Sequence, residues 1–214
     1  GPYRRLMLIL TLTSIPPRFD RLGSVLSDLV HQTVDAKVEL YIPHRYSRFP
    51  QWDGSLPDVP EGVTIFRSDD FGPATKVLPA VRQHVTENTP ILFCDYDATY
   101  APRWADTIMA DHTPGTAVAA TGFDAKRLGA PTPAAPAGYC DIAQGYSGIL
   151  IEPNMFDDSA FHIPQDCFLA DDLWLSAQLA KSNIAIKLAP AAAPMVTLHD
   201  NDEHALQFID RAGT

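Results

Sequence analysis

Two aspartates, Asp95 and Asp97, stand directly after the apolar run Ile91–Cys94 and are separated only by Tyr96. A short apolar run introduced by Pro90 is typical of a strand that is covered on both faces of a parallel sheet. Open α/β sheets bind ligands at the carboxyl ends of such strands. Because neighbouring carboxylates repel each other, the motif predicts a bound divalent cation, Mg²⁺ or Mn²⁺. On the motif alone an alternative stays open, in which both aspartates only cap a turn.

Two cations occupy comparable positions after other expected strands. Arg18 follows the strand expected at 6–13, and Lys76 closes the loop 69–76, which comes after the strand expected at 63–66. In a parallel sheet these loops emerge at the same edge as the aspartates. Arginine binds phosphate oxygens in a bidentate manner and lysine supplies a compact charge, so together with a metal ion they describe a diphosphate site. The alternative is that both are ordinary surface cations.

A second acidic pair, Asp171 and Asp172, opens an expected helix. The helix dipole and the free N–H groups stabilise carboxylates there, so capping accounts for one of the two. The other, if it faces a polar cavity, is suited to act as a general base toward a hydroxyl. His199 begins a stretch, 199–204, that is rich in metal-binding side chains. It is therefore a candidate metal ligand, with an ordinary surface role as the alternative.

The elements that position these residues alternate between strands and helices. Hydrophobic patterning predicts strands at 6–13, 38–42, 63–66, 91–94, 117–122 and 184–188. It predicts helices at 22–30, 77–81 and 104–109, a helix that begins at 171, and a closing helix at 203–211. Strand, helix, strand in this order implies right-handed parallel crossovers. We therefore expect an α/β fold with a mostly parallel central sheet flanked by helices.

Length and composition bound the class of protein. The chain has 214 residues, of which 46% are hydrophobic, and this suits one compact domain over 1–214. Gly1-Pro2 resembles the scar of a cleaved tag, and the chain is also compatible with one domain of a longer protein. The net charge of -10 argues against a nucleic-acid-binding surface. No apolar run is long enough to predict a transmembrane segment.

Cysteines and irregular segments refine this description. Three widely spaced cysteines without a Cys-x-x-Cys pair predict reduced thiols in a cytoplasmic protein. The segment 44–61 lacks periodicity and is expected to run over the surface. The proline-rich segment 126–138 predicts an extended mobile loop, which is either a substrate lid or a tolerated insertion. No Gly-x-Gly-x-x-Gly or Walker-type loop is present, which disfavours a dinucleotide oxidoreductase and a P-loop kinase.

Several segments taken together, and in this order, resemble GT-A glycosyltransferases. The segments are 13–18, 31–33, 70–76, the Asp-x-Asp motif at 95–97, and 171–176. The chain resembles in particular a group of small bacterial and chlorovirus transferases that includes a viral rhamnosyltransferase domain, and more broadly the inverting enzymes of family two. The Asp-x-Asp motif is short and common by itself, and its order with the other segments makes the resemblance specific. The resemblance implies a GT-A fold of the Rossmann-like type.

The resemblance also implies roles for individual residues. It implies a Mn²⁺ or Mg²⁺ ion bound by Asp97, Asp95 and His199, and a catalytic base at Asp172 next to Asp171. The donor nucleotide would be contacted by Thr11, Ser14, Arg18, Asp70, Lys76, Asp95 and Tyr96. The acceptor side would be formed by Gln144, Gly145, Tyr146 and Trp174. One departure concerns the nucleobase, because Pro43-His44-Arg45 replaces the aspartates usual after the second strand. Recognition of the base then falls to Asp69 or Asp70, and the identity of the base is open.

The function implied is metal-dependent, inverting transfer of a sugar in polysaccharide biosynthesis. The donor would be a nucleoside-diphosphate sugar and the acceptor a hydroxyl of a glycan or glycolipid. Three alternatives remain at the level of the sequence. They are a retaining transferase of the same fold, a metal-dependent sugar nucleotidyltransferase, and a non-catalytic module that binds nucleotide sugars or glycans.

Overall fold

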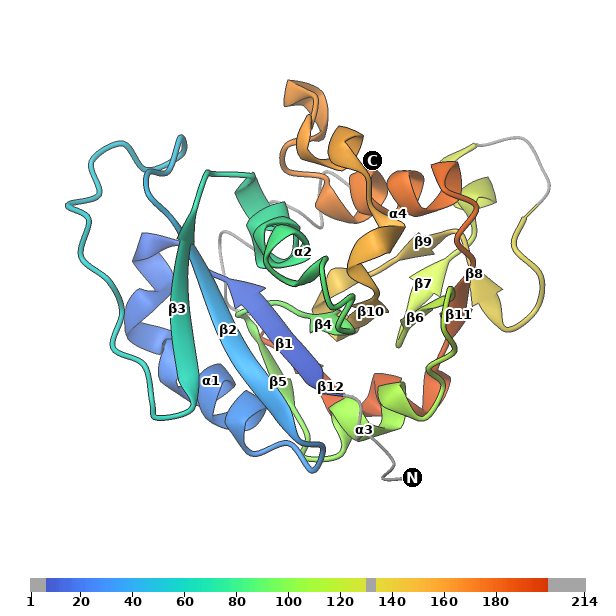
Figure 1. Cartoon of the computed structure of the whole chain (residues 1–214), viewed down its shortest axis with the longest axis horizontal. Coiled ribbons are helices and arrows are strands. Elements are labelled where there is room, and N and C mark those ends of the chain that lie inside the picture. Colours follow the sequence, from blue (N-terminus) through green and yellow to red (C-terminus); the bar gives the residue numbers. More distant parts are fainter. Residues whose placement is uncertain (1–6, 130–133, 200–214) are drawn as a thin grey trace.

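A computed structural model of the chain, which describes residues 7–129 and 134–199, shows a central sheet covered by helices on both faces (Figure 1). The sheet has eight strands in the order β3-β2-β1-β4-β10-β6-β11-β8. One half consists of parallel strands: β1 (Leu8–Thr13), β2 (Ala36–Pro43), β3 (Val63–Ser68) and β4 (Ile91–Phe93). The other half contains β6 (Ala117–Ala119), β8 (Tyr139–Cys140), β10 (Ile149–Ile151) and β11 (Ile186–Leu188). Only β10 and β8 run antiparallel to their neighbours, which confirms the mostly parallel α/β sheet.

Helices lie on both sides of this sheet and bury its two faces (Figure 1). Helices α1 (Leu22–Val30) and α3 (Trp104–Met109) pack against one face, and α2 (Leu78–His84) and α4 (Asp171–Lys181) against the other. In β1, Leu10 belongs to the first of these two cores and Ile9 to the second. Successive side chains of a strand point to opposite faces, so a strand covered on both sides must be apolar throughout. This explains the apolar runs Leu8–Leu10 in β1 and Ile91–Phe93 in β4.

Shorter elements connect these layers. Two small antiparallel pairs form between β5 (Ala98–Tyr100) and β12 (Val196–Leu198), and between β7 (Gly122–Phe123) and β9 (Ile142–Ala143). The 3-10 helices are η1 (Pro16–Arg21), η2 (Gly72–Lys76), η3 (Ala125–Leu128), η4 (Gly145–Ser147), η5 (Pro153–Met155), η6 (Asp158–Phe161), η7 (Gln165–Cys167) and η8 (Pro190–Met195). Within the described ranges, no helix has both the length and the apolar character that crossing a bilayer requires.

In the first half of the chain, the element boundaries predicted from the sequence agree well with those of the structure. The helices predicted at 22–30 and 104–109 form with those bounds, the segment 44–61 is irregular, and the cysteines are free thiols. Three predictions were wrong in detail. The strand predicted at 117–122 ends at Ala119, the strand predicted at 184–188 begins only at Ile186, and the loop predicted at 126–138 begins with a 3-10 turn. Residues 130–133 of that loop and the helix predicted at 203–211 lie outside the described residues.

The connection from η4 into β10 depends on a glycine. Gly148 has a φ of +104°, and a Cβ atom there would lie 2.5 Å from the ring of Trp104 and 3.0 Å from Ile108. Trp104 is fully buried and donates its indole N–H to the carbonyl of Ser147, at 2.8 Å. The backbone at 147–148 therefore lies directly against α3, and only a residue without a side chain fits there.

We predict that Gly148→Ala destabilises the protein by more than the strain of a positive φ alone, which is of order 1–3 kcal/mol. Gly115→Ala is the matched control, because Gly115 also has a positive φ, +83°, but has no atom within 4 Å of its Cβ position. Thermal unfolding of both variants measures the difference, at roughly 2–4 °C per kcal/mol for a chain of this size. Equal losses for the two variants would show that contact with Trp104 is unimportant.

Candidate active site

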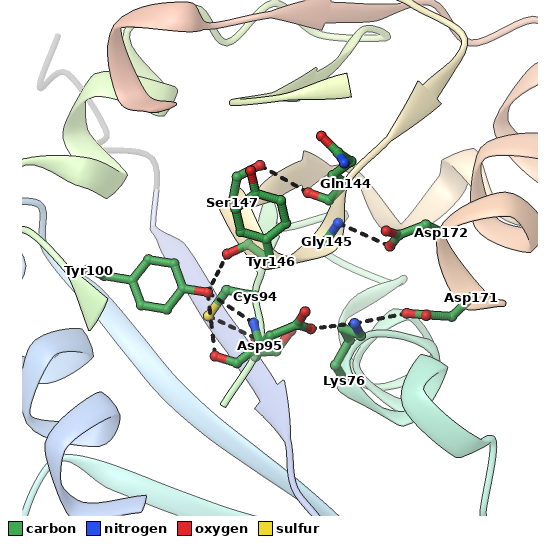
Figure 2. A network of polar contacts seen from close by, with 11 residues as sticks. Lys76, Cys94, Asp95, Tyr100, Gln144, Gly145, Tyr146, Ser147, Asp171 and Asp172 are labelled. Carbon is green, nitrogen blue, oxygen red and sulfur yellow. Dashed lines mark hydrogen bonds and ion pairs between the residues drawn. The ribbon is translucent and has the colours of Figure 1, made fainter. Parts of the chain in front are cut away.

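The ammonium group of Lys76 lies at the centre of an acidic cluster at the carboxyl edge of the sheet (Figure 2). Its Nζ atom is 2.5 Å from Asp95 Oδ1 and 2.8 Å from Asp171 Oδ2. Lys76 ends η2 and is only 4% exposed. Burial by itself lowers the pKa of Lys76, but the charges of Asp171, Asp95 and Asp172 outweigh it and hold that pKa well above its ordinary value. Lys76 is therefore a permanent buried cation that joins β4 to α4.

Asp172 is held by a different partner. Its Oδ1 atom accepts the backbone N–H of Gly145, at 3.0 Å (Figure 2). Burial and the neighbouring charge of Asp171 raise the pKa of Asp172 to about 8, against the opposite effects of Lys76 and of the Gly145 hydrogen bond. The side chain of Asp172 is partly exposed, so a ligand can reach it. Asp172 is thus placed to exchange a proton near neutral pH.

Gly145 allows this close approach of backbone to carboxylate. A Cβ atom at this position would lie 2.9 Å from Asp172 Oδ1 and 3.2 Å from Lys76 Nζ. Any side chain at this point would have to displace the ion cluster or the backbone. Gly145 therefore joins the turn of η4 to the acidic cluster.

The aspartates of α4 do not act as helix caps. The residue at the N-cap position is Ala170, and no side chain makes a capping hydrogen bond there. Asp171 instead reaches Lys76, and Asp172 reaches Gly145. Their partners are thus Lys76 and the N–H of Gly145, which belong to other segments, and not the free N–H groups of the first helical turn. The prediction that one aspartate caps the helix was therefore wrong.

The predicted metal ligands come together only in part. The backbone N–H of His199 donates to the carbonyl of Asp97, at 3.0 Å, so the end of β12 lies beside the turn that carries Asp97. The imidazole Nε2 of His199, however, lies 2.8 Å from Thr99 Oγ1. Within 7–129 and 134–199, no three His, Cys, Asp or Glu side chains form a group that could hold a metal ion. Residues 200–204, the rest of the ligand-rich stretch, lie outside the described residues.

The remaining donor-side residues line the same edge. Arg18 in η1 is 8% exposed, and its guanidinium carbon lies 5.7 Å from the centre of the Tyr96 ring. The hydroxyl of Ser14 is buried and makes no hydrogen bond within the described part of the chain. The hydroxyl of Thr11 likewise makes no hydrogen bond within the described residues. Thr11 is 0% exposed, so it offers no surface to a ligand in this conformation. Buried hydroxyls without partners are uncommon. Ser14 is only 1% exposed, so its hydroxyl, like that of Thr11, would reach a ligand only if the loop after β1 moved.

Asp70 organises the loops beside this edge. Its Oδ2 accepts the backbone N–H of Ser47, at 2.9 Å, and its Oδ1 accepts the N–H of Gly72, at 2.8 Å. An adjoining cleft of about 860 Å³ is lined by residues of three loops, among them His44, Tyr46, Trp52, Asp53, Asp69, Asp70 and Phe168. Both Asp70 oxygens are engaged in holding loops, and Asp53 accepts the N–H of Ser55. Of the two aspartates that the sequence indicated, Asp69 is therefore the one left for contact with a ligand. The sequence pointed to these two aspartates, but it did not identify the aromatic wall of the cleft.

The predicted acceptor residues lie in two places. Gln144, Gly145 and Tyr146 belong to the turn that contacts the acidic cluster (Figure 2). Trp174 lies in α4, is partly buried, and donates its indole N–H to the carbonyl of Ala160, at 2.8 Å. The turn thus forms part of the cluster, while Trp174 also anchors α4 to η6.

Comparisons with known proteins agree on the fold. No protein-family model matches the chain, and no curated protein matches it. Among solved structures, it is similar to the mannosyltransferase PcManGT from Pyrobaculum calidifontis in complex with GDP-Man and Mn²⁺, at 14% identity and a TM-score of 0.50. That match covers 88% of this chain, which spans only 55% of the length of the mannosyltransferase.

A second similar structure is the galactosyltransferase LgtC in complex with donor and acceptor sugar analogs. Here the identity is 8% and the TM-score 0.51, and the match covers 97% of this chain and 95% of the other. Both matches cover most of this chain, at low sequence identity. The chain therefore has the GT-A fold of nucleotide-sugar glycosyltransferases.

Proposed function

We propose that this chain transfers a sugar from a nucleoside-diphosphate sugar to a hydroxyl of a glycan or glycolipid acceptor, with inversion and with the help of a divalent metal ion. The observation that carries the proposal is the buried Lys76 cation, which contacts carboxylates of β4 and α4 at the ligand-binding edge of a GT-A fold. A lysine in this position supplies the charge that a departing diphosphate needs. The two similar structures, bound to GDP-Man and to sugar analogs, support the substrate class.

The donor would lie across this edge. Lys76 and Arg18 would contact the diphosphate, and the Ser14 hydroxyl would gain a partner once a movement of the loop after β1 exposes it. The neighbouring cleft of about 860 Å³ is large enough for a nucleoside, and its aromatic side chains and Asp69 would contact the base. This arrangement leaves the sugar pointing toward Asp172 and the turn at 145–147.

The metal site is supported by the donor chemistry of two residues. Asp95 and Asp97 supply carboxylate oxygens, the ligands that Mg²⁺ and Mn²⁺ prefer, and such ions are often held by one or two carboxylates together with substrate phosphates. The ring of His199 lies with Thr99, so we assign the ion to the two aspartates and treat His199 as a secondary ligand. When bound, the ion would neutralise negative charge on the leaving diphosphate.

The base would be Asp172. It is partly exposed and is oriented by the Gly145 N–H, while Asp171 is committed to Lys76. Its ionised form would take the proton of the acceptor hydroxyl as the new glycosidic bond forms. Asp172 would form no covalent bond to the donor sugar. The acceptor oxygen would then displace the diphosphate directly, and direct displacement inverts the anomeric carbon.

We predict that Asp172→Asn lowers kcat by about 10²–10⁴-fold, the usual contribution of a general base. Asparagine can still accept the Gly145 N–H, so nucleotide affinity measured by calorimetry should stay close to that of the wild type. Asp106→Asn is the control, because Asp106 also lies in the first turn of a helix but is exposed on α3. Full transfer activity in Asp172→Asn would remove this residue from the base role.

The pKa of Asp172 predicts a pH dependence for transfer. The base works only when ionised, and its pKa is raised to about 8, so kcat/KM should rise about tenfold per pH unit below pH 8 and level off above it. The profile should be measured with Mg²⁺ at constant ionic strength. A flat profile between pH 6 and 8 would contradict the assignment of the acid limb to Asp172.

The metal proposal predicts that Asp97→Ala removes the effect of Mn²⁺ on donor binding. Calorimetry with UDP, GDP and dTDP sugars, with and without Mn²⁺, measures this effect and also identifies the nucleobase. The control is Asp111→Asn, which changes an aspartate that pairs with Lys187 away from the site, at 3.0 Å. If Asp97→Ala keeps normal Mn²⁺-dependent affinity, the metal does not bind at this aspartate.

A further inference from the structure

A buried tyrosine outside the predicted site connects two of its segments. Tyr100 lies in β5, is 1% exposed, and packs its ring against Trp104 with centroids 4.2 Å apart. Its hydroxyl oxygen accepts the backbone N–H of Asp95, at 3.1 Å, and its hydroxyl group donates to the carbonyl of Tyr146, at 2.6 Å (Figure 2). The carbonyl of Asp95 is farther, at 3.4 Å, and the hydroxyl has one hydrogen, which the shorter bond uses.

The two segments that meet at this hydroxyl carry the two sides of the proposed reaction. Asp95 contacts Lys76 through its carboxylate and belongs to the donor side. Tyr146 follows Gly145, whose N–H holds Asp172 on the acceptor side. A single oxygen atom thus contacts the backbone of both segments, and these are far apart in the sequence.

Tyr100 itself is held from a third direction. Its backbone N–H donates to Asp28 Oδ2 in α1, at 3.1 Å, and its strand pairs with β12. The backbone of Tyr100 is therefore held by α1 and β12, which are separate from the two segments that its hydroxyl contacts. With its backbone held in this way, the Tyr100 hydroxyl can set the distance between the Asp95 backbone and the turn at 145–147.

Resting on the transferase function proposed above, we propose that the Tyr100 hydroxyl is a positioning group that fixes the Asp95 backbone and the turn at 145–147 relative to each other, so that Asp172 faces the donor sugar. Tyr100 does not touch the substrate. It acts through Asp95 and Gly145. Lys76 joins the same two sides through side-chain charges, and Trp104 holds the turn at the Ser147 carbonyl without a bond to Asp95, whereas the Tyr100 hydroxyl bonds the backbone of both segments.

The test is Tyr100→Phe, which keeps the ring against Trp104 and removes only the hydroxyl. The expected result is a fall in kcat of about 10–100-fold with a change in donor KM below about threefold, because a small misplacement of reacting groups affects the chemical step most. Tyr41→Phe is the matched control, since Tyr41 is also buried and loses a single bond, to Glu39 at 2.8 Å, away from the site. Its kcat and KM should stay within about twofold of the wild type.

A second measurement separates positioning from general loosening of the fold. If Tyr100 acts through Asp172, adding Tyr100→Phe to Asp172→Asn should lower the residual activity no further. Should Tyr100→Phe not fold, Asp28→Ala removes the acceptor that anchors the Tyr100 backbone N–H and should itself lower kcat without raising donor KM.

Each outcome has a distinct meaning. Equal kcat for Tyr100→Phe and Tyr41→Phe, additive losses in the double variant, or an unchanged kcat in Asp28→Ala would each overturn the positioning role while leaving the transferase function intact. A wild-type chain that transfers no sugar from any of the UDP, GDP and dTDP donors would overturn the proposed function, and the positioning role with it.

Discussion

The burial of one ammonium group among carboxylates is the interaction on which the candidate site depends. Lys76 cannot leave water without partners, because an isolated buried charge is very costly. Asp95 and Asp171 supply those partners from two elements that are far apart in the sequence. The ion cluster thus ties the end of β4 to the start of α4, and it keeps a cation where a diphosphate would need one. Burial raises the pKa of Asp172 most, and the charges of Asp171 and Asp95 raise it further, while Lys76 acts in the opposite direction.

Residues around the cluster hold it in place through backbone shape and hydrogen bonds. Gly145 lets the backbone approach Asp172, and Gly148 lets the next turn lie on Trp104. Asp70 uses both carboxylate oxygens to fasten the neighbouring loops. These residues contribute shape and hydrogen bonds, whereas the charged residues contribute the chemistry. Preorganisation of this kind fixes the site before a substrate arrives, so less conformational freedom is lost on binding.

Part of this site could be predicted from the sequence, because Asp95, Lys76 and Asp172 follow or precede elements with strong hydrophobic patterns. Parallel strands then bring their ends to one edge, and proximity follows from topology. The direction of β10 could not be predicted, since Ile149–Ile151 has the same apolar pattern whichever way the strand runs. The imidazole orientation of His199 and the partner of Asp171 depend on side-chain geometry that no local pattern contains. Tyr100 was missed for a related reason, because its ring resembles any core aromatic and only its hydroxyl bonds set it apart.

The reversed direction of β10 has a consequence for how such a site can diversify. β4 ends at the ligand-binding edge, whereas β10, antiparallel to it, begins there. The proposed donor side is formed by the segment that follows β4, and the proposed acceptor side by the segment that precedes β10. Residues inserted before Gln144 would lengthen the segment that leads into β10 without shifting the register of Ile149–Ile151 in the sheet. The segment before β10 can therefore change in length and shape while Lys76, its carboxylates and β4 stay as they are. Under the proposed function, the choice of acceptor is then separate from the residues that bind the donor.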